Sequence, residues 1–400
     1  MQGERVFWFS WCGLAFGERR KSFFTQNATV ILRKRAETSL AMPAQPRYAS
    51  RPMNERTHAP HAASWLLLAG ALGVPLSLLW DFGWESTVGI DLVWGGPHVM
   101  TYLAVAMAAV AAVWMIVRGK SGVVLAGMRA PVGAWVALWG AVAFVVAFVF
   151  DRWWQASYGM AAGIWHPPQM AKAVAFFAIA CGAWWCVPRW GGGVVVALIG
   201  VVSMAQGFAN RQHDAFFYKL ACGAYPLVLA AAAMSGGGRW AATRAALLGM
   251  SIHLAAVWVL PLVPGVPETG PIYNMRDHLL PPPFPPLIVL PALAMDWLLA
   301  ARKDAGWRSA GEVGFAFFAV FAVVQWRFAG FLLSPGADNW FFAGGGKQWP
   351  FFLRISEEMR TAFWPGEVLE IKNAALAVAL AAASSRIGIW LGAWLTRTAR

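Results

Sequence analysis

Long apolar runs separated by short polar segments make up most of the chain from Ser64 onward. Several runs reach roughly 18 residues or more, which is the length that an α-helix needs to cross the hydrocarbon core of a bilayer. Because backbone N–H and C=O groups in lipid must bond one another, this pattern predicts helices rather than strands. The predicted spans cover residues 65–81, 98–117, 130–150, 169–187, 190–208, 216–235, 241–263, 284–301, 312–334 and 372–395.

The fold class predicted from this pattern is all-α, a polytopic transmembrane bundle of about ten helices that forms a single domain over residues 64–400. Composition agrees, since 59% of the residues are hydrophobic and 13% are charged, whereas soluble domains carry about 25% charged residues. Residues 1–63 are polar and basic, with ten Lys or Arg and four Glu. We expect them to be a disordered basic tail or an extension upstream of the true start, for which Met53 is a candidate.

The distribution of basic residues predicts the orientation in the membrane. Alternate loops carry the positive charge, which by the positive-inside rule places them and both termini in the cytoplasm. The net charge of +13 is therefore explained by topology rather than by nucleic-acid binding. We expect a multi-pass protein of the bacterial inner membrane, in contact with the lipid bilayer and with other membrane subunits as candidate partners. The basic residues concerned are Arg118, Lys120, Arg129, Arg189, Arg239, Arg244, Arg302, Lys303, Arg308, Arg397 and Arg400.

One motif occurs twice in the first half of the chain. The segment "DFGWESTVGIDLVWGGPH" from Asp81 aligns with "DRWWQASYGMAAGIWHPPQ" from Asp151. Four pairs share an offset of 70, and three further pairs share an offset of 71 after a one-residue gap. Each copy joins the outer end of one predicted helix to the start of the next. The sequence therefore predicts a duplicated helical hairpin, with copies at about 65–118 and 130–187.

The first copy carries a candidate metal site with the spacing D-x3-E-x12-H. Asp81 and Glu85 are four residues apart and would share one helical face, and His98 follows Pro97 at the expected start of the next helix. Two carboxylates and one imidazole are a suitable ligand set for a divalent transition metal. Asp91 is expected to ligate or to orient His98. A purely structural role at a solvated helix end stands equally beside this interpretation.

The second copy retains fewer ionisable residues. Gln155 and Gln169 stand where the first copy has Glu85 and His98, which leaves Asp151 and His166 as weaker candidate ligands. We expect a degenerate copy with a structural role.

Other polar residues are candidates for a second shell or for a pathway. His253 lies inside a predicted span, where an ionisable residue is a functional candidate, although a histidine bonded across helices is as good an explanation. Asp277 and His278 lie on the outer side. The lysines and arginines inside predicted spans are expected to pair with acids such as Asp296.

The motif resembles two known groups of proteins. Asp81 and His98 match the outer two ligands of the D-x3-H-x12-H metal site in the C subunit of particulate methane and ammonia monooxygenases, and Glu85 replaces the central histidine. The resemblance covers about twenty residues, and it implies copper; the exchange of His for Glu leaves iron, zinc and manganese open. From about Trp65, the chain also resembles an uncharacterised family of bacterial polytopic membrane proteins with the same duplicated motif.

The first functional hypothesis is thus a membrane protein with a transition-metal site at its periplasmic face, similar to the copper membrane monooxygenases; whether it is an enzyme stays open. The second is a secondary transporter or metal-handling permease, with Lys172, Lys219, His253 and Arg327 along a path. The third is an accessory or scaffold subunit of a membrane complex.

Overall fold

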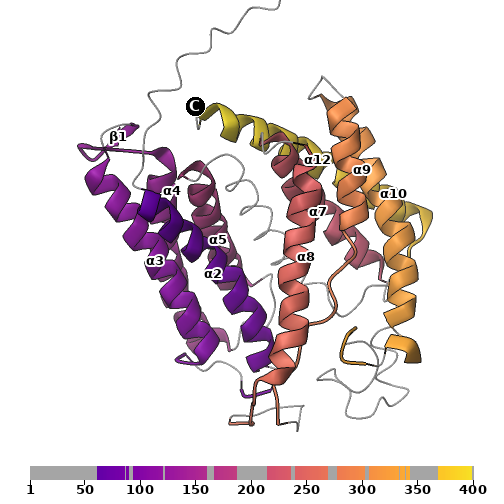
Figure 1. Cartoon of the computed structure of the whole chain (residues 1–400), viewed down its shortest axis with the longest axis horizontal. Coiled ribbons are helices and arrows are strands. Elements are labelled where there is room, and N and C mark those ends of the chain that lie inside the picture. The colour runs from indigo at the N-terminus through magenta and orange to yellow at the C-terminus, as the bar shows by residue number, and fades with distance from the viewer. Residues whose placement is uncertain are drawn as a thin grey trace, which may run out of the picture. The chain divides into compact units, whose positions relative to one another are not determined.

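The computed structural model describes residues 61–85, 87–89, 93–119, 122–159, 166–186, 214–235, 239–268, 277–301, 306–332, 334–337, 339–342 and 368–398. All of them belong to one compact unit, Thr57–Arg400. The described residues form nine α-helices (Figure 1): α2 (His61–Glu85), α3 (Gly96–Arg118), α4 (Val132–Tyr158), α5 (Pro167–Cys186), α7 (Ala215–Met234), α8 (Ala241–Val259), α9 (Val289–Ala301), α10 (Trp307–Leu332) and α12 (Ile371–Thr398).

Eight of these helices, all except α9, are long and apolar enough to cross a membrane. The chain is therefore an integral, multi-pass membrane protein, as the hydrophobic runs predict. The predicted span 190–208 lies outside the described residues, and so does most of the predicted tail, residues 1–63.

The small remaining elements connect helices. Strands β1 (Val123–Leu125) and β2 (Met128–Ala130) form an antiparallel hairpin between α3 and α4. Ala126 and Gly127 have positive φ, as a tight two-residue hairpin turn requires. The short 3-10 helices η1 (Leu260–Leu262) and η2 (Pro335–Ala337) follow α8 and α10.

The described helices pack in two groups. One buried apolar cluster is built mainly from α2, α3, α4 and α5, and a second from α7, α8, α9, α10 and α12. Within the first group, α2 packs on α3, α4 on α5, and α3 on α4. These four helices lie side by side in Figure 1, coloured indigo to magenta.

Glycines allow α2 to pack on α3, and α4 on α5, backbone against backbone. A Cβ added at Gly70 of α2 would lie 2.6 Å from the Ala104 carbonyl oxygen and 2.8 Å from the Ala108 nitrogen. A Cβ at Gly140 of α4 would lie 2.9 Å from both the Ala175 oxygen and the Ile179 nitrogen. Gly140 follows Gly70 by 70 residues, and the contacted residues of α5 follow those of α3 by 71. The close contact thus recurs at the offsets of the sequence repeat.

The predicted span 284–301 is wrong in its first part, because the helix begins only at Val289. Residues 279–286, with the sequence LLPPPFPP, form a buried strap without helical structure. Proline fixes φ, and its ring clashes with a helical carbonyl, which prevents the helix from starting earlier.

Two of the strap's three backbone N–H groups donate to described partners, although the strap is irregular and buried. Five of its eight residues are prolines, which have no N–H to satisfy. Leu279 N donates to the Val263 oxygen and Leu280 N to Thr87 Oγ1. Just beyond the strap, Leu287 N donates to Gln325 Oε1. Non-helical backbone at membrane depth is tolerated only where protein supplies such partners.

We expect Gly70→Ala to destabilise the protein, because its added Cβ overlaps the backbone of α3 and forces α2 and α3 apart. Overpacking of this kind costs about 1–3 kcal/mol. Thermal unfolding in detergent would measure the change. Gly223→Ala in α7 is the matched control, since nothing lies within 4 Å of the added Cβ. Alanine is the better helix former, so this variant should be neutral or more stable. Equal melting temperatures for the two variants would contradict the close helix contact.

Candidate metal centre

Asp81, Glu85 and His98 come together where α2 ends and α3 begins. Asp81 and Glu85 occupy the last turns of α2, one turn apart, and His98 lies in the first turn of α3. Gly96 allows this approach, because a Cβ there would lie 2.7 Å from the ring of Trp80. Pro97 follows within the first turn, where its missing N–H is no loss to the helix.

The three side chains form a cluster that could hold a metal ion. One ligand atom from each residue lies within 4.8 Å of the other two. His98 Nε2 is 3.4 Å from Asp81 Oδ1, and these side chains are 27% and 20% exposed. Donors on one small ion with ligand distances of about 2.0–2.2 Å stand roughly 3–3.5 Å apart. The pair of Asp81 and His98 already has that separation, and small side-chain rotations would bring in Glu85.

The Asp81 carboxylate is the least satisfied of the ligand groups. Its Oδ1 atom is buried and has no hydrogen-bond partner among the described residues. Removing a carboxylate oxygen from water without a partner is unfavourable. A cation bound between Asp81 and His98 would supply the missing partner.

Neighbouring side chains hold α2 and α3 in register just inside the cluster. Thr101 Oγ1 donates to Ser77 Oγ at 2.8 Å, and Ser77 Oγ donates to the Val74 carbonyl at 2.7 Å. Both hydroxyl residues are buried. The Tyr102 ring stacks on the His98 imidazole, with ring centroids 6.5 Å apart. The two ligand-bearing helix ends are therefore fixed relative to each other.

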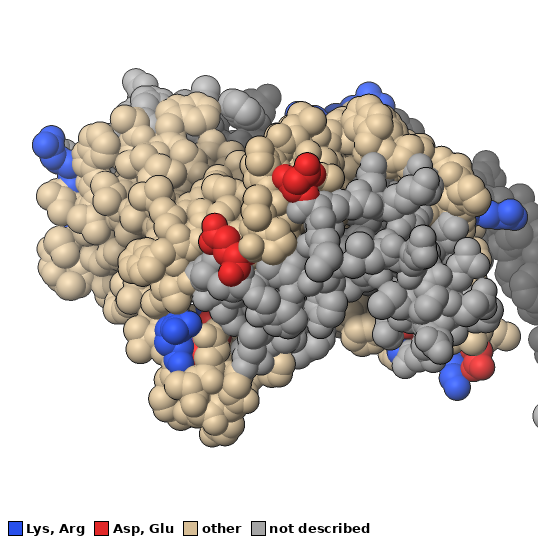
Figure 2. All heavy atoms as spheres, turned by 90° about the horizontal axis from the view of Figure 1, so that it is seen from below, with Lys and Arg blue, Asp and Glu red and all other residues tan. Residues whose placement is uncertain are grey.

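The turn after α2 is tied to the loops that flank the strap. Val88 N donates to the Trp84 carbonyl, and the Val88 carbonyl accepts from Glu268 N at 2.8 Å. A Cβ added at Gly83 would lie 2.7 Å from the Leu280 carbonyl oxygen, so α2 and the strap are in direct contact. Figure 2 views this end of the protein and shows that it has few described acidic and basic side chains.

The structure gives different surroundings to the other predicted residues of this end. Asp91 lies outside the described residues. His278 is paired with its neighbour, its Nδ1 donating to Asp277 Oδ1 at 3.0 Å. That hydrogen bond holds the pKa of the exposed Asp277 carboxyl below its usual value. Neither residue belongs to the three-residue group that the described part of the chain contains.

His253 anchors the strap. It is 1% exposed, and its Nε2 donates to the Pro283 carbonyl at 2.8 Å. Its Nδ1 has no hydrogen-bond partner within the described residues. Of the two explanations left open by the sequence, the geometry favours a histidine bonded between α8 and the strap.

Among the described residues, Asp296 does not pair with a lysine or arginine inside the spans. Its carboxylate instead accepts from the backbone N–H groups of Ala242 and Thr243 and from Thr243 Oγ1. These groups lie at the start of α8, where the orphan donors and the helix dipole favour an anion.

In the second hairpin, a lysine neutralises the aspartate. Asp151 is 4% exposed, and its Oδ2 forms a salt bridge with Lys172 Nζ of α5 at 2.5 Å. Gln155 Nε2 also donates to Asp151 Oδ2, at 3.3 Å. His166 lies beside the Trp154 ring, with centroids 6.4 Å apart. A metal at Asp151 and His166 stays a prediction, and the nearby ammonium opposes it because like charges repel.

The lysine has no counterpart in the first hairpin. The repeat offset of 71 that matches His98 with Gln169 also matches Thr101 with Lys172. At the matched positions, the first hairpin thus has Asp, Glu, His and Thr, and the second has Asp, Gln, Gln and Lys. This exchange can be found in the sequence by extending the alignment three residues beyond Gln169. The contact between Lys172 and Asp151 itself requires the structure.

No protein-family model matches the chain, and neither a curated protein nor a solved structure is significantly similar to it. These comparisons identify no family, so the resemblances noted in the sequence rest on the motif residues alone.

We expect Lys172→Met to destabilise the protein strongly, because it leaves the Asp151 carboxylate buried and uncompensated. Breaking a buried ion pair by removing one partner costs about 3–5 kcal/mol. The double variant Asp151→Asn, Lys172→Met should regain much of this loss, since the charge is then absent. Thermal unfolding of both single variants and the double variant in detergent measures the coupling. Strictly additive effects would show that the two side chains do not interact.

Proposed function

We propose that the chain binds a divalent transition-metal ion through Asp81, Glu85 and His98. The observation that carries this proposal is the convergence of three suitable donors, from two different helices, to within 4.8 Å. Two carboxylates offset the charge of a divalent ion. Asp81 Oδ1 is buried and lies 3.4 Å from His98 Nε2, but it accepts no hydrogen bond among the described residues, and this supports the same conclusion.

The donor set favours some metals over others. One imidazole and two carboxylates suit manganese, iron and zinc, because carboxylate favours manganese and imidazole favours iron and zinc. Copper is the metal that the monooxygenase resemblance implies, but Glu85 stands where that motif has a second imidazole. We therefore propose manganese, iron or zinc as the native ion.

Three protein ligands leave coordination positions open for water or a substrate, which is the arrangement of catalytic rather than structural metal sites. An enzymatic role similar to the membrane monooxygenases is supported only by the spacing of Asp81 and His98. Metal binding is the part of the hypothesis that the geometry supports directly.

We further propose that the two hairpins arose by duplication and that the cluster faces the periplasm of a bacterial inner membrane. The recurring glycine contacts at Gly70 and Gly140 support the duplication. The predicted cytoplasmic loops are the basic ones, and this supports both the orientation and the cytoplasmic termini.

The alternatives receive less support from the described residues. In a transporter, Lys172 and His253 would line a path. Instead, Lys172 is bound to buried Asp151, and His253 to the Pro283 carbonyl. A scaffold role explains neither the convergence of the three donors nor their difference from the matched residues of the second hairpin.

We expect the purified protein to contain about one equivalent of metal per chain, and His98→Ala to lose most of it. Loss of one ligand removes a coordinate bond. Even the mutation of a residue that only hydrogen-bonds a ligand lowers metal affinity about 10–100-fold, so the loss of a ligand should cost at least as much. Inductively coupled plasma mass spectrometry of protein purified in detergent gives both the metal and its amount. Acidification should release the ion, because protons compete for the imidazole and carboxylates.

Gln169→Ala is the matched control, since Gln169 occupies the position of His98 in the second hairpin. It should retain the metal. Equal metal content in wild type and His98→Ala would exclude the site.

The second hairpin offers a gain-of-function test. We expect the triple variant Gln155→Glu, Gln169→His, Lys172→Thr to bind a second equivalent of metal, because it restores the donors of the first hairpin around Asp151 and removes the competing ammonium. Metal analysis counts the equivalents. The double variant Gln155→Glu, Gln169→His, which keeps Lys172 on Asp151, is the control and should bind one. A triple variant that folds but binds only one equivalent would show that the two hairpins are not equivalent at this position.

A further inference from the structure

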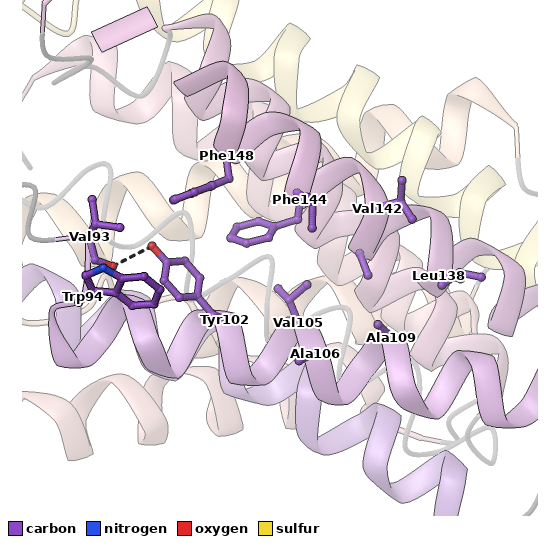
Figure 3. A pocket seen from close by; sticks show the side chains of 12 residues that line it. Val93, Trp94, Tyr102, Val105, Ala106, Ala109, Leu138, Val142, Phe144 and Phe148 are labelled. Carbon is purple, nitrogen blue, oxygen red and sulfur yellow. Dashed lines mark hydrogen bonds between the residues drawn. The ribbon is translucent and has the colours of Figure 1, made fainter. Parts of the chain in front are cut away.

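A groove of about 460 Å³ lies between α3 and α4 (Figure 3), and Tyr102 in its lining contacts His98 of the candidate metal centre. Its α3 wall carries Tyr102, Val105, Ala106 and Ala109, which lie on one face of the helix at the spacing of successive turns. On α4, aliphatic and phenylalanine side chains form the opposite wall, and Val93 and Trp94 close one end. The lining is apolar throughout, except for the polar atoms of Tyr102 and Trp94.

The polar group nearest the groove is already used. The Tyr102 hydroxyl donates to the Val93 carbonyl at 3.0 Å, shown as the dashed line in Figure 3. A polar molecule in the groove would therefore lose its water and gain few partners in return, which is unfavourable. An aliphatic chain needs no such partners.

The groove is accessible from the bilayer. Both of its walls are helices that are long and apolar enough to span a membrane. On α4, Val142 and Val145 are 43% and 59% exposed, and in a membrane such side chains contact lipid. Trp94, Trp153 and Tyr158 are exposed at the end of the hairpins where the cluster lies. Exposed Trp and Tyr typically mark the membrane interface, which puts the groove directly below it.

The closed end of the groove adjoins the metal ligands. Tyr102 lines the groove, and its ring stacks on His98. Along α3, the groove extends from Tyr102 to Ala109, which is about 10 Å at 1.5 Å per residue. A chain lying in it with its head toward Tyr102 would place that head about one helical turn from His98, with the Tyr102 side chain between the head and the Asp81, Glu85 and His98 cluster.

We propose that the groove binds the aliphatic chain of a fatty acid from the adjacent leaflet and that the carboxylate of this fatty acid binds the metal ion held by Asp81, Glu85 and His98. The second half of this statement rests on the proposed function. A bound divalent ion with open positions attracts an oxygen anion, and the groove has room for one chain. The ligand of the centre is then an amphiphile taken from the membrane rather than a water-soluble molecule.

The test uses a fatty acid with a photoreactive diazirine in its chain, added to full-length protein in nanodiscs, with the labelled peptides mapped by mass spectrometry. We expect labelling of α3 and α4 along the groove. Ala106→Trp, which fills the groove with an indole, should reduce it by about tenfold or more. Ala173→Trp is the control, because Ala173 is exposed on α5 and is not part of the groove lining. It should label like wild type.

Metal analysis of the same samples separates this proposal from the metal site. Ala106→Trp should retain its metal while losing the label, and His98→Ala should lose its metal and weaken the label.

Unchanged labelling in Ala106→Trp would show that the fatty-acid chain does not bind in the groove. Unchanged labelling in His98→Ala, in a preparation whose wild type holds metal, would overturn the placement of the carboxylate. A wild type that labels in the groove but holds no metal would refute the proposed function and leave the chain site standing. Equal labelling by a diazirine phosphatidylcholine that excess fatty acid does not displace would identify bilayer phospholipid as the occupant and overturn the choice of a fatty acid.

Discussion

Within the membrane, the protein itself must satisfy every polar group, because lipid offers no hydrogen bonds. The described helices meet this requirement with their own backbones. The strap at residues 279–286 meets it differently: most of its residues are prolines without an N–H, and Thr87, Gln325 and His253 bond groups of the strap and of its continuation. Buried side chains that look functional in the sequence thus have a structural role where irregular backbone is buried.

The same requirement applies more strongly to charge. Two buried acids have defined partners. Asp296 accepts hydrogen bonds at the N-terminus of α8, and Asp151 forms a salt bridge with the ammonium of Lys172. At the matched place in the first hairpin, Asp81 faces the His98 imidazole, and the residue in the position of Lys172 is Thr101. A divalent cation would neutralise the Asp81 carboxylate of the first hairpin, as Lys172 neutralises the Asp151 carboxylate of the second. The two hairpins thus surround their aspartates differently, and among the described residues only the first hairpin has a group of three donors that could hold a metal ion.

The surroundings of the cluster are compatible with chemistry on a membrane-soluble molecule. The candidate ligands are half-buried at the end of α2 and the start of α3, and in the proposed orientation this end faces the periplasmic water. Tyr102 contacts His98 and also lines an apolar groove, whose walls are helices long and apolar enough to span a membrane. A site placed between the two phases can hold the polar and apolar ends of one amphiphile at once.

Local patterns in the sequence were sufficient for the helices and for the candidate cluster. Runs of apolar residues determine where a chain can cross lipid, and eight described helices follow them. Asp81, Glu85 and His98 could be predicted as neighbours, because a short connection between two antiparallel helices brings the end of one to the start of the next. The predictions for Asp91 and for residues 190–208 lie outside the described residues and stay predictions. Only the tertiary structure decided that Lys172 binds Asp151, that the segment before Val289 is a buried strap held by His253 and Gln325, and that α3 and α4 enclose a groove. These features depend on which helix faces meet, and that choice results from packing over the whole surface of each helix, which no short stretch of sequence contains.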